Sequence, residues 1–347
     1  MKVNRIHQYS FFVMTLWGGM IIGQGDEWTW LHRKIFTQQE LKNNSYKKEL
    51  LFSKEDSQPF SQMMFSWNAV RDHEGHVSFW SQVRNPETKQ WGVWHKMMDW
   101  GNGIQRSFGG SKDAHTRYEH VRLELQSGCY ADGFRIKIIA HDGASLGSIK
   151  SFAVSLSDYS KFEPEVVPNG GIRFPSLCLD GVPKKAQLGL DHPRAAHLCS
   201  PTSCSMVVGY FMNESIDAVD FAQKAFDEGL NAYGSWPFNT AHAFEECNGA
   251  VWFATARMHS FQGMYKQLRR GMPVVVSVRG WIDGAPKSYD SGHLLVVIGW
   301  DARTQSVICH DPAFVRDEDV VKYYPIQSFL LAWERSRRLV YVADPVV

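Results

Sequence analysis

The chain has 347 residues, of which 44% are hydrophobic, and its 37 Lys and Arg residues nearly balance its 36 Asp and Glu residues. Length and composition together predict a globular protein of two or three domains with sizeable cores. The formal net charge of +1 gives no electrostatic basis for nucleic acid or an anionic membrane as a partner. The function therefore has to be sought in individual sites.

We expect residues 1–25 to be a secretory signal peptide. Lys2 and Arg5 precede an apolar stretch over residues 11–22, and small glycine residues follow it, which is the order of segments in such peptides. The alternative is a membrane anchor, but this stretch is shorter than the roughly 20 apolar residues that span a bilayer. The sequence therefore predicts an extracytoplasmic protein, secreted or periplasmic, with no stable membrane span after signal cleavage.

Residues 26–158 are predicted to form an antiparallel β-sandwich domain. Apolar and polar residues alternate in four short runs, at residues 76–83, 121–126, 133–139 and 151–156. Alternation with a period of two is typical of strands with one buried face. Turn residues separate the runs, and several short strands divided by turns favour two packed antiparallel sheets.

Tryptophans are concentrated in this half of the chain, at Trp67, Trp80, Trp91, Trp94 and Trp100. One interpretation is that the rings fill the core, because large aromatic side chains dominate burial in small β-domains. The other is a surface platform on which sugars or a cell-wall polymer stack, because exposed aromatic patches mark binding surfaces. Both interpretations stay open at the level of the sequence.

A segment rich in Pro and Gly, residues 159–180, is predicted to link this domain to a second one over residues 181–347. Helical patterns come first in the second domain, at residues 206–211 and at residues 260–271, where basic residues and Gly271 mark a helix C-terminus. Apolar runs typical of strands follow at residues 272–281, 293–301, 305–312 and 338–344. Helices followed by strands indicate an α+β domain.

Cys199 is the candidate nucleophile. Pro201 fits the first turn of a helix and Ser200 fits its N-cap, so the Cys199 thiol would face the positive end of the helix dipole and unpaired backbone N–H groups. Such surroundings lower the pKa of a thiol and stabilise a developing oxyanion. The alternative is an inert buried thiol, which is the expectation for Cys204 in the following turn.

His293 is the candidate base and Asp311 is its expected partner. The apolar runs at 293–301 and 305–312 flank a turn-like segment and should pair as an antiparallel hairpin. Folding the chain about Ala302–Arg303 brings His293 almost opposite Asp311, where a carboxylate can fix the tautomer of an imidazole. The alternatives are another base, among His192, His197 and His310, and a simple turn starting at Asp311 before Pro312.

No cofactor or metal is predicted. The six cysteines are too few and too scattered for a disulfide framework, and no Cys-x-x-Cys pair occurs. A zinc site built on Cys309 and His310 lacks the paired-ligand spacing of such sites.

Several segments of the second half resemble, in order, the bacterial C39-like papain-fold peptidases of the branch with an additional N-terminal β-domain. HLCSPTSCSMV at residues 197–207 is similar to the nucleophile motif of that family, and YGSWPFNTAHA at residues 233–243 resembles its Gly-x-Trp-x-Phe-Asn-Thr-Ala segment. The later strands match in the same order, with the catalytic His and Asp of the family falling on His293 and Asp311. The resemblance implies a papain-like α+β fold with a Cys-His-Asp triad.

The resemblance also implies a glutamine that donates a hydrogen bond to the oxyanion. Gln187 follows a Val-Pro pair, as this glutamine does in the family, but its separation from Cys199 is longer than in compact members. The segment 279–293, which runs into His293, is either a loop at the border of the cleft or a passive connection.

Together these residues predict a secreted cysteine peptidase that acts on a peptide or protein substrate through Cys199, His293 and Asp311. One alternative is a cell-wall peptide amidase or transpeptidase with the same triad, because a fold does not determine the substrate. The other is a non-catalytic surface-binding protein on a papain-like scaffold.

Overall fold

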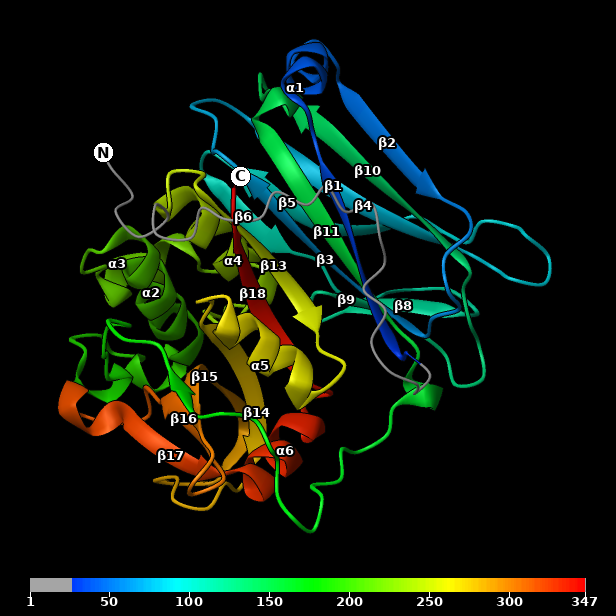
Figure 1. Cartoon of the computed structure of the whole chain (residues 1–347). Helices are drawn as coiled ribbons and strands as arrows, with labels where there is room; N and C mark the ends of the chain where they lie inside the picture. The colour runs from blue at the N-terminus through cyan, green and yellow to red at the C-terminus, as the bar shows by residue number, and fades with distance from the viewer. Residues whose placement is uncertain (1–26, 347) are drawn as a thin grey trace.

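The computed structural model describes residues 27–346, which form mostly antiparallel sheets with six α-helices (Figure 1). The signal peptide expected over residues 1–25 lies outside this range. Within it, none of the helices combines the length and the apolar character that crossing a membrane requires.

Two antiparallel sheets make up the N-terminal part. The six-stranded sheet has the order β1 (Thr29–Ile35), β11 (Ile149–Ser157), β3 (Gln62–Ala69), β9 (Arg122–Leu125), β8 (Thr116–Glu119) and β7 (Ser111–Lys112). The five-stranded sheet has the order β2 (Glu49–Lys54), β10 (Gly133–His141), β4 (His76–Arg84), β5 (His95–Gly101) and β6 (Ile104–Ser107). Helix α1 (Gln38–Asn44) lies between β1 and β2 in the chain. The four alternating runs of the sequence are confirmed as strands β4, β9, β10 and β11.

Aromatic side chains from the two sheets share one core. Phe65 and Trp67 of β3 place their ring centroids 5.1 and 4.5 Å from that of Phe79 on β4. Farther along, Phe52 of β2 meets Phe152 of β11 edge to face at 5.3 Å. The apolar positions of the alternating runs are thus buried between the sheets, as a period of two requires.

The five tryptophans of the N-terminal part differ in their exposure to solvent. Trp67 and Trp100 are buried in the core, whereas the other three are partly exposed. Cations cover these partly exposed rings: the Arg135 guanidinium lies 3.8 Å from the Trp91 centroid, and Lys137 lies 4.4 Å from that of Trp94. Lys137 also lies 5.4 Å from the ring of Trp80.

The C-terminal part is built on a third antiparallel sheet, which has seven strands. Its strand order is β13 (Val251–Arg257), β18 (Leu339–Pro345), β14 (Val274–Gly280), β15 (Tyr289–Asp301), β16 (Ser306–His310) and β17 (Val321–Pro325), and the short β12 (Leu177–Cys178) also pairs with β15. The helices are α2 (Cys199–Met212), α3 (Ala218–Lys224), α4 (Trp236–Glu246), α5 (Phe261–Arg269) and α6 (Ile326–Arg335). The two helices and four strands expected from the sequence here are confirmed as α2, α5, β14, β15, β16 and β18.

Helices cover both faces of this sheet. Val275, Leu294 and Val296 pack with α2, α3 and α4, and the residues that alternate with them, including Val276 and Leu295, pack with α5 and α6. Strands buried on both faces read as continuous apolar runs, which explains the sequence of β14 and β15.

The edge strand β13 is docked on the N-terminal sheet by side chains. The Asn68 amide of β3 donates to the Phe253 carbonyl at 2.9 Å and accepts from the Phe253 N–H at 2.8 Å. Two residues farther along each strand, Ser66 accepts from the Thr255 N–H at 3.2 Å. A side-chain amide thus replaces the neighbouring strand that β13 lacks on this side.

A second contact ties the N-terminal part to the loop between α3 and α4. The buried Asp227 carboxylate accepts from the Ser107 N–H at 2.8 Å and from its hydroxyl at 2.6 Å. Gln105 donates to two carbonyls at the end of α3, both at 2.8 Å. The backbones approach so closely that a Cβ added at Gly229 would lie 1.9 Å from the Ser107 carbonyl oxygen.

Candidate active site

Helix α2 begins at Cys199 itself. The sequence predicted a start after Ser200, but the N-cap is Leu198, and Ser200 is the second helical residue, with its hydroxyl 2.9 Å from that of Tyr341. Cys199 is half-buried, and the helix after it is buried almost throughout. The thiol therefore lies in the first turn, where backbone N–H groups lack helical partners and the dipole favours negative charge.

His293 lies on β15, a strand that packs against this helix (Figure 1). The Ser203 hydroxyl of α2 donates to the Leu294 carbonyl at 3.1 Å and fixes the helix against the strand. The His293 side chain is 4% exposed and interacts with the Cys199 thiol by a hydrogen bond. Its Nε2 lies 2.7 Å from Oδ1 of Asp311, which leaves Nδ1 as the nitrogen for the thiol.

Asp311 follows β16 and is fully buried. Four donors surround its carboxylate: besides His293, the Ala313 N–H donates to Oδ1 at 2.9 Å, and the Tyr289 and Tyr324 hydroxyls each donate to Oδ2 at 2.6 Å. The carboxylate is thus held in one orientation, with Oδ1 toward the imidazole.

The register of the hairpin differs from the expected one. Val296 pairs with His310, and Asp301 pairs with Ser306, so the hairpin turns one residue later than expected and contains a bulge. His293 and Asp311 are therefore not opposite each other. Their side chains still meet because Asp311 lies just beyond the paired part of β16 and reaches diagonally across the sheet.

Tyr289 and Tyr324 are site residues that the sequence reasoning missed. Tyr289 also stacks on the His293 imidazole, with centroids 4.2 Å apart and planes 18° apart. Tyr289 and His293 are four residues apart on one strand, and residues an even number apart share a face. The sequence pattern could therefore have indicated Tyr289 as a neighbour of His293. Tyr324 lies on β17, where it pairs with Val307, four residues before Asp311, and its hydroxyl reaches the Asp311 carboxylate.

Electrostatics favour a charged pair. Burial alone would raise the pKa of Cys199, but the hydrogen bond and charge of His293, with backbone groups of Leu294 and Ser200, lower it. Burial acts to lower the pKa of His293, yet Asp311 and Cys199 outweigh it and raise this pKa to about 9. Burial likewise opposes ionisation of Asp311, but His293 and the tyrosine hydroxyls lower its pKa. These directions together describe a thiolate facing an imidazolium.

Gln187 contacts both the segment that follows Asp311 and the segment that precedes Cys199. Its backbone N–H donates to the Pro312 carbonyl at 2.8 Å, next to Asp311, and its side-chain Nε2 donates to the Ala195 carbonyl at 3.1 Å, four residues before Cys199. The side chain is buried, and one N–H of its amide is not used by the contact with Ala195. The structure places Gln187 beside the site without a direct contact to Cys199.

The other candidates of the sequence lie elsewhere. Cys204 and Cys309 are buried, and burial raises the pKa of both thiols. His310 bonds the Pro183 carbonyl through Nδ1, and His192 faces the Tyr233 hydroxyl. Among residues 27–346 there is no group of three or more His, Cys, Asp or Glu side chains arranged to hold a metal ion.

Comparison with known proteins places the C-terminal part in a family. Residues 179–341 match the model of the Peptidase_C39 like family. The fold is similar to a C39-like peptidase structure from Bacillus anthracis (19% identity, 50% of this chain and 99% of that one, TM-score 0.38). It is also similar to xylellain, a cysteine protease from Xylella fastidiosa (11% identity, 54% and 91%, TM-score 0.32).

No curated protein matches the chain. Both TM-scores lie below 0.5, so the assignment depends on the sequence match. Over residues 179–341, just under half of its length, the chain therefore matches the Peptidase_C39 like family.

Proposed function

We propose that the protein is a cysteine peptidase with Cys199 as nucleophile, His293 as general base and acid, and Asp311 as the residue that orients the imidazole. Membership of a peptidase family supports peptide hydrolysis. The observation that carries the residue assignment is the chain of contacts from the thiol at the start of α2, through the imidazole, to a buried carboxylate 2.7 Å from Nε2.

The proposed residues account for each step of peptide hydrolysis. The Cys199 thiolate attacks the carbonyl carbon of the substrate, and backbone N–H groups at the start of α2, with the free N–H of Gln187, stabilise the oxyanion. The His293 imidazolium then gives its proton to the leaving amine, and an acyl-enzyme remains. Next, His293 takes a proton from water, the hydroxide attacks the thioester, and the thiolate leaves.

The proposal also covers the N-terminal part of the chain and the location of the enzyme. We infer that residues 26–158 form a β-sandwich beside a papain-like domain over residues 181–347, with residues 159–180 as the link, because the two N-terminal sheets share an aromatic core. The pattern of residues 1–25 supports export. N-terminal sequencing of the mature protein tests the export step: a start at residue 1 would contradict it.

Alkylation of Cys199 as a function of pH tests the assignment. We expect iodoacetamide to modify Cys199 well below the free-thiol pKa of about 8.5, and we expect this reactivity at low pH to vanish in His293→Ala. Cys178 is an internal control because reagents can reach it. Partial loss of hydration and the charge of Asp180 raise its pKa, so it should react only at high pH. Equal pH profiles for Cys199 and Cys178, read by mass spectrometry, would refute the ion pair.

Turnover is tested with Cys199→Ala. This variant should fold like the wild type and lose hydrolysis of an unfolded protein substrate, because Cys199 is the thiol that hydrogen-bonds His293. Retained hydrolysis would show that Cys199 is not the nucleophile. Cleavage of purified cell wall, with the unfolded protein left intact, would redirect the proposal to a cell-wall peptide.

A further inference from the structure

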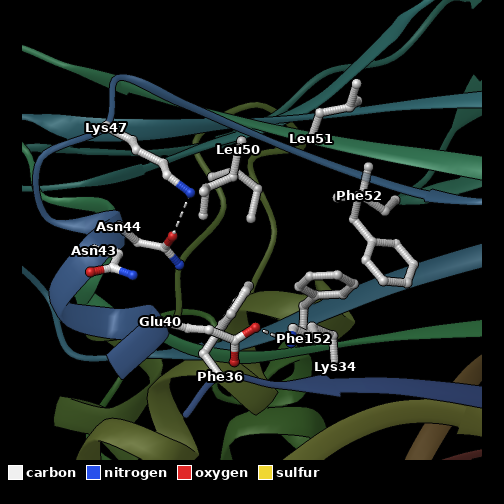
Figure 2. A pocket seen from close by; sticks show the side chains of 12 residues that line it. Lys34, Phe36, Glu40, Asn43, Asn44, Lys47, Leu50, Leu51, Phe52 and Phe152 are labelled. Atoms are coloured by element: carbon white, nitrogen blue, oxygen red, sulfur yellow. Dashed lines mark hydrogen bonds and ion pairs between the residues drawn. The ribbon is translucent and has the colours of Figure 1, made fainter. Parts of the chain in front are cut away.

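A second site lies in the N-terminal part, apart from the candidate active site. A cavity of about 240 Å³ opens beside α1, between β1 and β11 of one sheet and β2 and β10 of the other (Figure 2). Its apolar wall consists of Phe36, Leu50, Phe52, Ile136, Ile138 and Phe152. None of the proposed catalytic residues lines it, so the peptidase mechanism gives this cavity no role.

One polar group of the wall lacks a partner. Asn44, at the end of α1, is 3% exposed, and its Oδ1 accepts from the Lys47 ammonium at 3.2 Å. Lysine only donates, so Oδ1 must be the amide atom that faces it, and Nδ2 is directed away from Lys47 toward the space between the labelled side chains (Figure 2). This Nδ2 has no hydrogen-bond partner in the described structure. A buried donor without an acceptor is unfavourable, and a ligand acceptor would satisfy it.

The charges at the rim favour an anion. Lys34 donates to Glu40 at 2.5 Å, and Glu40 also accepts from the Thr37 N–H in the capping box of α1. Glu40 is therefore committed to protein groups. Lys47, by contrast, donates to the neutral Asn44 amide and forms no ion pair with any carboxylate of residues 27–346. An uncompensated ammonium and an amide donor thus lie together above an apolar wall.

We propose that this cavity binds a small alkyl carboxylate, with the carboxylate accepting from Asn44 Nδ2 and Lys47 and the alkyl chain packed on the phenylalanine and isoleucine side chains. The two groups at the rim that are free to bind a ligand, the Lys47 ammonium and Asn44 Nδ2, are both donors, so the polar end of the ligand must accept, and the positive charge selects an anion. The volume lies below the roughly 300–1,000 Å³ of sites for drug-sized ligands, so the alkyl chain is short.

Calorimetric titration of the whole protein with butanoate, hexanoate and octanoate, below their micelle concentrations, tests the ligand class. We expect affinity to rise about fourfold per added methylene until the cavity is filled. Octan-1-ol and octylamine keep the chain but lose the carboxylate, and should bind at least tenfold more weakly than octanoate. The proposal falls if none of the three carboxylates saturates the protein or if octanol binds as tightly as octanoate.

Variants locate the site. Lys47→Met, at an exposed position, should weaken octanoate binding about tenfold, and Asn44→Asp should weaken it further because a carboxylate replaces the donor. Lys48→Met removes a neighbouring exposed charge that does not line the cavity and should leave binding within about twofold of wild type. Cys199→Ala should bind octanoate normally. Unchanged binding in Lys47→Met would overturn the proposal even if Asn44→Asp does not fold.

Discussion

Asp311→Asn should remove the negative charge that keeps His293 protonated beside the Cys199 thiolate. Asp311 is the first of the groups that raise the His293 pKa from 6.5 to about 9 against the effect of burial, and this difference corresponds to about 3 kcal/mol in favour of the imidazolium. With a neutral amide in its place, burial prevails and His293 stays neutral at pH 7. The thiolate then loses its counter-ion, and kcat/KM should fall by about two orders of magnitude or more.

Two assays measure this effect. Hydrolysis of a labelled unfolded protein gives kcat/KM, and alkylation of Cys199 between pH 5 and pH 10 should show an inflection that moves up toward that of a free thiol, about 8.5. Glu318→Gln, which neutralises an exposed carboxylate on the segment after Asp311, is the matched control, and near-UV circular dichroism reports folding. A folded Asp311→Asn protein with wild-type alkylation at pH 6 and less than a threefold loss of kcat/KM would refute the reasoning.

The same carboxylate sets the pH dependence of stability. Because the His293 pKa is raised in the folded state, its contribution is complete below about pH 6.5 and is lost as pH rises through the folded value. The thiolate acts in the opposite direction, because the Cys199 pKa is lowered, so the comparison is made in Cys199→Ala. That variant should lose stability from pH 6.5 toward pH 9 in urea titrations. Addition of Asp311→Asn should flatten the profile, and equal slopes would contradict the coupling.

Two further substitutions test other contacts. Tyr324→Phe removes one of the hydroxyls that donate to Asp311 Oδ2, and the free energy of unfolding should fall by about 1.5–3 kcal/mol, the usual value for a hydrogen bond to a charged group; an unchanged urea midpoint would show that this hydroxyl does not hold the carboxylate. Gly229→Ala would place Cβ 1.9 Å from the Ser107 carbonyl oxygen, whereas a Cβ at Gly234 meets nothing within 4 Å. The first should therefore lower the Tm by several degrees and the second should leave it unchanged, and equal Tm values would refute the close approach.

The alternating strands were predictable because their apolar faces point into one core, but the first strand of the chain was not. In β1, the apolar Leu31 and Ile35 are exposed, as Arg33 between them is, whereas His32 and Lys34 are half-buried. At the four positions other than Arg33, the apolar side chains lie on the exposed face of the strand and the polar ones on the more buried face, which is the reverse of the usual pattern. The sequence of β3 posed a different problem, since its polar Asn68 reads as solvent-facing but binds β13.

The site was predictable to the extent that the hairpin brings His293 toward Asp311. The register error of one residue did not matter, because a side-chain contact tolerates a diagonal arrangement. The sequence did not indicate that α2 would begin at Cys199, since this depends on how the preceding chain enters the helix. The contact of Asp311 with Tyr324 on β17 depends on strand order, which local patterns do not specify.

The docking of β13 on Asn68 and Ser66 determines how the protein can be dissected. A fragment limited to residues 179–347 would keep the proposed catalytic residues but expose the backbone donors and acceptors of an edge strand, a template for intermolecular pairing. Such a fragment should aggregate, so its loss of activity would be a matter of solubility. The N-terminal sheets therefore shield that edge from intermolecular pairing, so the two parts should have to be expressed together.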